Sequence, residues 1–145
     1  TWLEEKYFVV LDRYTYSNIA YQCAKMNTED DVRKLKEWIL KLEFEYFGIP
    51  KPDINIFLDV PLRFTEEKLR DRKVGDKRSY LLGNSDIHES SLEFQKKVRD
   101  IYTKVAEDDQ SLQVINCHDE NNRMPAPEKI FEMIINKLKE RNILR

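Results

Sequence analysis

Residues 54–61, with the sequence INIFLDVP, predict a buried β-strand that ends at Pro61. Two further segments have the same apolar character, YFVVL at residues 7–11 and LQVINC at residues 112–117. Residues 7–11 show no alternation of apolar and polar side chains. Such a run is typical of a strand that is covered on both faces, as in a parallel sheet.

Helical periodicity lies between the predicted strands. Residues 17–25 predict a short helix with Ser17 as its N-cap. A longer helix follows, which Thr28 or Asp30 caps and Gly48 ends. The predicted apolar face of this longer helix consists of Val32, Leu35, Ile39, Leu42 and Tyr46.

Three more helices are predicted after residue 61. They are a charged helix at residues 65–72, a helix at residues 90–107 and a final helix opened by Ala126 or Pro127. The residues expected to face the core are Leu92, Val98, Ile101, Tyr102 and Val105 in the second of these helices, and Ile130, Phe131, Ile134 and Leu138 in the last.

The alternation of strands and helices predicts an α/β fold, with a parallel sheet flanked by helices in one domain over residues 1–145. Ligands of such sheets bind beyond the carboxyl ends of the strands. Asp12, Arg13, Asp59 and the loop after Cys117 occupy those positions. Asp59 could be a turn former at the strand end or contribute to a magnesium site, and the pattern leaves both open.

Composition limits the class of protein. The chain has 145 residues and a net charge of -2, and its 41% hydrophobic content is enough for a core. The near-neutral balance disfavours a general nucleic-acid binder. No stretch approaches the ~18 apolar residues of a membrane span, and the first residues lack the pattern of a secretory signal. Cys23 and Cys117 form no CxxC pair, so we expect reduced packing residues in a cytoplasmic protein.

Residues 12–21, DRYTYSNIAY, directly follow the first predicted strand. They resemble the Asp-Arg-Tyr motif of the thymidylate kinases, which are P-loop enzymes that phosphorylate dTMP with MgATP. Residues 52–60 resemble the family's fourth strand, and residues 70–88 resemble its arginine-bearing lid. Residues 89–95 look like the helix after the lid. Residues 114–117 are similar to the strand whose exit loop packs on adenine.

This resemblance implies a P-loop nucleoside monophosphate kinase type of fold. It also implies transfer of a phosphoryl group from MgATP to dTMP, which gives dTDP for dTTP synthesis. Magnesium would arrive with ATP, with no protein side chain assigned as a direct ligand. Members of the family are commonly homodimers, so a homodimer is expected.

The resemblance also assigns roles to the motif. Arg13 would bind the dTMP phosphate, for which a guanidinium is suited. Asp12 would orient Arg13 or organise water near magnesium. Ser17 would belong to the dTMP site, Asn18 would bond the thymine edge, and Tyr21 would crowd a 2′-hydroxyl and so favour deoxyribose.

Further roles fall on later segments. Arg72 or Arg78 would close over the transferring phosphoryl group, whose developing charge needs cations. Glu89 and Gln95 would reach the lid side of the site, with Glu89 also on the magnesium side. Cys117 and His118 would belong to the loop on the adenine side. His88 and His118 have no further ligands at metal-binding spacing, and both are expected at the surface.

One departure from the family pattern is large. The three glycines, Gly48, Gly75 and Gly83, build neither G-x-G-x-x-G nor G-x-x-x-x-G-K-[ST]. We therefore expect the carboxyl-terminal two-thirds of a longer protein, without roughly 70–90 residues that carry the phosphate loop. The alternatives are a nucleotide-binding module without catalysis, and a helical interaction domain with no nucleotide affinity.

Overall fold

The computed structural model describes residues 2–5, 7–67, 92–121 and 123–144. The chain forms two compact units, Thr1–Pro50 and Lys51–Arg145. Each unit has its own helices, and the sheet belongs to the second unit.

The sheet of the second unit consists of β1 (Asn55–Asp59) and β2 (Leu112–Asn116). The two strands run parallel, with Asn55 opposite Leu112 and Asp59 opposite Asn116. The ladder continues for one bond at its far end, where the Cys117 amide donates to the Asp59 carbonyl over 2.8 Å. The prediction of a parallel sheet that contains these two segments is confirmed.

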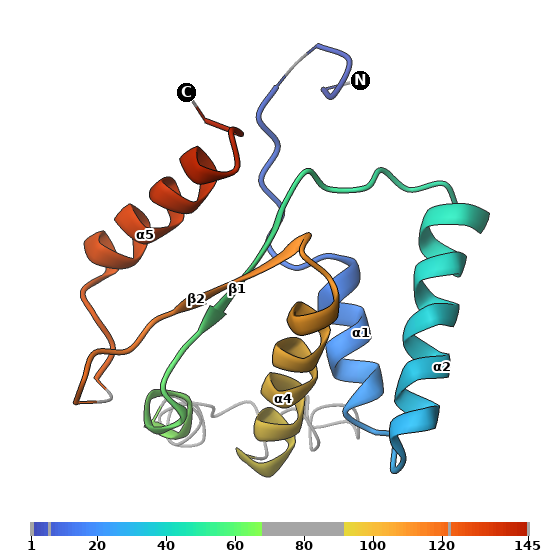
Figure 1. The fold of residues 1–145 in the computed structure, drawn as a ribbon, viewed down its shortest axis with the longest axis horizontal. Coiled ribbons are helices and arrows are strands. Elements are labelled where there is room, and N and C mark those ends of the chain that lie inside the picture. The colour runs from blue at the N-terminus through green and yellow to red at the C-terminus, as the bar shows by residue number, and fades with distance from the viewer. Residues whose placement is uncertain (1, 6, 68–91, 122, 145) are drawn as a thin grey trace, which may run out of the picture. The chain divides into compact units, whose positions relative to one another are not determined.

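Helices cover both faces of this pair, as Figure 1 shows for α4 (Leu92–Asp108) and α5 (Pro127–Glu140). On one face, Ile115 and Cys117 form a buried cluster with Ile130 of α5. On the other face, the Phe57 ring stacks on Tyr102 of α4 with centroids 4.3 Å apart. The predicted α/β arrangement, a parallel sheet flanked by helices, is therefore present.

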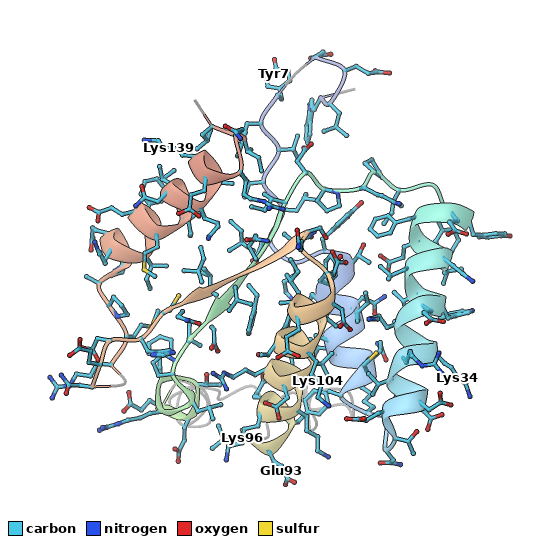
Figure 2. The ribbon with its side chains drawn as sticks, viewed as in Figure 1. Tyr7, Lys34, Glu93, Lys96, Lys104 and Lys139 are labelled. Atoms are coloured by element: carbon cyan, nitrogen blue, oxygen red, sulfur yellow. The ribbon has the colours of Figure 1, made fainter. Side chains whose placement is uncertain are left out.

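The two flanking helices are amphipathic. The buried side of α4 carries Phe94, Val98, Ile101 and Val105. Figure 2 labels Glu93, Lys96 and Lys104 along the exposed side of the same helix. In α5, Ile130 and Leu138 are buried as predicted, but Phe131 is 62% exposed, so its inward assignment is wrong. Phe131 lies one residue from Ile130, a step that turns it about 100° from the core face.

The helix expected at residues 65–72 begins earlier than predicted. Residues 62–67 are already helical, directly after Pro61. The Thr65 amide donates to the Pro61 carbonyl over 3.3 Å. Across the described ranges, no helix is both long and apolar enough to cross a membrane.

The first unit packs α1 (Thr15–Cys23) against α2 (Glu29–Leu40), and α2 continues into the π-helix η1 (Lys41–Tyr46). Thr28 is the N-cap of α2, because its hydroxyl accepts from the Asp31 amide over 3.1 Å. Acidic residues in the first turn suit the positive end of the helix dipole. On the exposed side of α2, Lys34 projects outward in Figure 2 and pairs with Asp30.

Two predictions about these helices are corrected. Helix α1 begins at Thr15, and Ser17 is inside it, with its amide donating to the Tyr14 carbonyl over 2.9 Å. Tyr46 is 81% exposed and so does not belong to the apolar face. It lies at the end of η1, where wider turns shift side chains away from the 3.6-residue period. Gly48 ends this helix with a φ of 63°, as its position predicted.

The strand predicted at residues 7–11 does not form. These residues have no regular secondary structure, and all five side chains are exposed. A strand is stable only when its amides and carbonyls pair with a neighbour. Among the described residues, β1 and β2 pair only with each other, so residues 7–11 have no neighbouring strand.

Replacement of Ile115 tests the core of the second unit. Ile115→Ala removes buried methylenes between β2 and α5, and we expect a loss of about 2–5 kcal/mol in the free energy of unfolding. Phe131→Ala is the matched control on α5 and should change it by less than about 0.5 kcal/mol. Urea unfolding followed by circular dichroism measures both. Equal losses would contradict the described packing.

Candidate functional site

The turn before α1 positions the guanidinium of Arg13 against side chains of that helix. Arg13 has a φ of 71°, in the left-handed region that non-glycine residues seldom adopt. Its Nε donates to the Ser17 hydroxyl over 2.7 Å. The guanidinium carbon lies 4.4 Å from the ring centroid of Tyr21. Arg13, Ser17 and Tyr21, called the Arg13 stripe, are linked by these two contacts, although Arg13 itself precedes Thr15, the first residue of α1.

These contacts fix the plane of the guanidinium. Nε donates its hydrogen bond to Ser17, and one face of the guanidinium lies on the Tyr21 ring. Within the described residues, the two terminal nitrogens of Arg13 have no hydrogen-bond partner. A planar group with two free terminal nitrogens can bind two oxygens of a phosphate or carboxylate at once. Asp12 is exposed beside it.

Three hydrogen bonds join α1 and the residue before it to the second helix and the segment that follows that helix. The Tyr14 hydroxyl donates to the Pro50 carbonyl over 3.0 Å. The Asn18 Nδ2 donates to Glu43 Oε1 over 2.8 Å. The Cys23 thiol donates to the Val32 carbonyl over 3.6 Å. The predicted site residues of the first unit, Asp12, Arg13, Ser17, Asn18 and Tyr21, thus lie together at the start of α1, which the second helix supports.

Sequence reasoning missed Glu43. Its partner Asn18 is 25 residues away along the chain. No local pattern joins a position in α1 with a position in η1. The apolar face of the longer helix predicted that this helix packs against another part of the chain. It did not predict which polar side chain would contact Asn18.

In the second unit, Asp59 at the end of β1 forms an ion pair with Arg99 of α4. Arg99 Nε donates to Asp59 Oδ1 over 2.5 Å, and Nη2 donates to Oδ2 over 2.7 Å. The Asp59 side chain is 7% exposed and that of Arg99 37%. The hydrogen bond to Asp59 raises the pKa of Arg99.

Both carboxylate oxygens of Asp59 are therefore occupied by Arg99. A role of Asp59 in a magnesium site stays a prediction. Arg99 was not predicted. A buried acid at a strand end needs a partner for its charge, but that requirement does not identify a residue of α4.

The segment after β2 separates two predicted site residues. The Cys117 side chain is buried in the cluster with Ile115 and Ile130, and its thiol donates to the Ile115 carbonyl over 3.4 Å. Burial raises the pKa of the Cys117 thiol, and the Asp59 carboxylate raises it further. His118 is exposed. A role of this loop near adenine stays a prediction.

Gln95 lies in the first turn of α4 and is partly buried. Arg72, Arg78, Glu89, His88 and the predicted lid at 70–88 lie outside the described residues. In the ranges that the structure does describe, no group of three or more His, Cys, Asp or Glu side chains gathers as a metal site.

Comparison with known proteins adds a decisive observation. A family model described as thymidylate kinase matches residues 1–124. The chain belongs to the thymidylate kinase family. The match extends from the Arg13 stripe through β1, α4 and β2, so both units carry it.

Curated thymidylate kinases are similar over much of this chain. The thymidylate kinase of Mycobacterium tuberculosis is 33% identical over 99 residues, which cover 68% of this chain and 44% of that protein. A probable thymidylate kinase of Pyrococcus abyssi is 31% identical over 133 residues, 92% of this chain and 52% of that protein. The chain thus spans about half the length of the curated thymidylate kinases that it matches.

The Asp59–Arg99 pair is expected to stabilise the second unit. Arg99→Ala would leave a buried carboxylate without its cation, and we expect a loss of about 2–3 kcal/mol in the free energy of unfolding. Arg63→Ala is the control, because Arg63 pairs with Glu67 at the surface and should contribute about 0–1 kcal/mol. Urea unfolding measures both variants. A loss for Arg99→Ala no greater than for Arg63→Ala would show that Asp59 does not depend on its partner.

Thiol reactivity tests the burial of both cysteines. Desolvation raises the pKa of the Cys23 thiol as well as that of Cys117. A raised pKa lowers the thiolate fraction at a given pH, and only the thiolate is nucleophilic. We expect iodoacetamide to modify both thiols more slowly in the native protein than in urea, with the onset moved to higher pH. Peptide mass spectrometry measures the modification of each cysteine. Equal modification rates in the native and the unfolded protein would contradict the burial of the thiols.

Proposed function

We propose that the protein transfers the γ-phosphoryl group of MgATP to dTMP, giving dTDP. The observation that carries the proposal is the Arg13 stripe, in which Ser17 and Tyr21 hold the guanidinium and its terminal nitrogens have no partner in the part of the chain that the structure describes. Membership of the thymidylate kinase family supports this choice of reaction. A supply of dTDP would serve dTTP synthesis in the cytoplasm, and the working form would be a homodimer.

In this proposal Arg13 binds the phosphate of dTMP with its terminal nitrogens. Because Nε is already bonded to Ser17, the side chain loses little conformational freedom when the phosphate arrives. Asp12, the residue before Arg13, would orient Arg13 or hold water near magnesium. Magnesium bound to ATP would neutralise charge on the phosphate oxygens.

Tyr21 would contact the sugar. Its ring lies under the guanidinium that would bind the phosphate, so the deoxyribose attached to that phosphate comes close to the same side of α1. A 2′-hydroxyl would meet the ring, which favours deoxyribose. Asn18 would bond the thymine edge, while Arg72 or Arg78, Glu89 and Gln95 would act from the lid side and Cys117 and His118 from the adenine side.

The reaction itself is tested with purified protein. Addition of dTMP to protein and MgATP should release ADP in a coupled assay, and the ribonucleotide should be a weak acceptor. Preference for dCMP over dTMP would overturn the substrate assignment. Calorimetric binding of dTMP without ADP release would instead support a nucleotide-binding module.

Arg13 is the residue on which substrate binding should depend most. Arg13→Ala is expected to weaken dTMP binding by about 10- to 100-fold, because a charged hydrogen-bond donor to phosphate is lost, and to lower turnover. Arg33→Ala is the control, since Arg33 lies exposed on α2 and pairs with Asp30. The KM for dTMP and the calorimetric Kd are the measurements. Unchanged values in Arg13→Ala would remove Arg13 from the site.

A further inference from the structure

We propose that Glu43 is a positioning residue that fixes the orientation of the Asn18 amide, and that it thereby selects a base with a hydrogen-bond donor at N3. The inference rests on the proposed function, because it concerns the base of the nucleotide that Arg13 would hold. It assigns to Glu43 a part in distinguishing thymine from cytosine.

The chemistry of the pair determines which way the amide points. A glutamate carboxylate at neutral pH only accepts hydrogen bonds, whereas an asparagine amide has one donor end and one acceptor end. Asn18 must therefore turn its NH2 group toward Glu43, and Nδ2 lies 2.8 Å from Oε1. The carbonyl oxygen of Asn18 is directed away from the carboxylate, and in the described part of the chain it accepts no side-chain hydrogen bond.

The backbone around Glu43 holds its side chain in place. Glu43 lies in η1, where the chain leaves regular α-helical geometry, a feature frequent at functional sites. The Glu43 carbonyl accepts from the Ile49 amide over 3.1 Å. A second bond, from the Tyr14 hydroxyl to the Pro50 carbonyl, joins the end of this segment to the start of α1. The end of the segment that carries Glu43 is thus attached to the residue that precedes α1.

Asn18 is also next to the proposed phosphate site. It follows Ser17, which bonds Arg13, and it is exposed at the surface of α1. A nucleotide whose phosphate is held by Arg13 and whose sugar lies near Tyr21 would bring its base toward this part of the helix. The amide of Asn18 is then available to the base edge.

The orientation of that amide decides which base is accepted. Thymine and uracil carry an N3–H donor, which matches the outward carbonyl oxygen of Asn18. Cytosine carries a lone pair at N3, so two acceptors would face each other. Rotation of the amide to accept cytosine would break the bond to Glu43 and place oxygen against oxygen. Glu43 therefore acts chiefly by making the wrong base unfavourable.

Glu43→Gln is the decisive variant because it keeps the size of the side chain and removes the charge. A glutamine can offer either a donor or an acceptor, so Asn18 becomes free to turn. We expect the ratio of Kd for dCMP to Kd for dTMP, measured by calorimetry on the full chain, to fall by about tenfold. Glu45→Gln is the matched control, because Glu45 lies two residues further along η1 and is exposed, and it should keep the wild-type ratio.

A double-mutant cycle separates positioning from a general structural effect. Asn18→Ala should itself lower the ratio, and Glu43→Gln should then change it no further in the Asn18→Ala background. Loss of affinity for both nucleotides in equal proportion, or a ratio unchanged in Glu43→Gln, would overturn the proposal. Wild-type protein that binds no dTMP would instead overturn the proposed function, and this inference with it.

Discussion

Parallel pairing between β1 and β2 is the constraint on which the second unit depends. Parallel strands cannot be joined by a tight turn, so the connecting chain must cross one face of the pair. Helix α4 lies in that connection and covers the Phe57 face, while α5 returns over the Ile115 face. Because both faces are covered, the acid at the end of β1 is buried, and Arg99 of α4 supplies the required cation.

In the first unit, the corresponding constraint is the packing of α1 on α2 and η1. The Arg13 guanidinium contacts Ser17 and Tyr21 of α1, and this arrangement depends on the left-handed backbone of Arg13 in the turn before the helix. The contacts of Asn18 with Glu43 and of Tyr14 with Pro50 need the second helix as well. The proposed phosphate contact thus depends on local structure, whereas the proposed base contact depends on tertiary packing.

Sequence reasoning was most accurate where a pattern extends over a whole element. The buried sides of α4 and α5, the cap at Thr28 and the stop at Gly48 follow from periodicity and from cap chemistry. It was wrong for residues 7–11, because apolar composition alone does not supply a neighbouring strand. It misplaced Tyr46 because a period of 3.6 residues does not hold in a π-helix.

The sequence by itself determined the family, the amphipathic helices, the strand segments within residues 54–61 and 112–117, and the motif at residues 12–21. Each of these depends on residue types at short, regular spacing, or on a motif carried within ten residues. Only the tertiary structure decided that Asp59 meets Arg99, 40 residues away, and that Asn18 meets Glu43, 25 residues away. Whole helices pack by their apolar sides, and this packing determines which polar groups come within hydrogen-bonding distance of each other. Partners so far apart in the sequence therefore follow from tertiary packing.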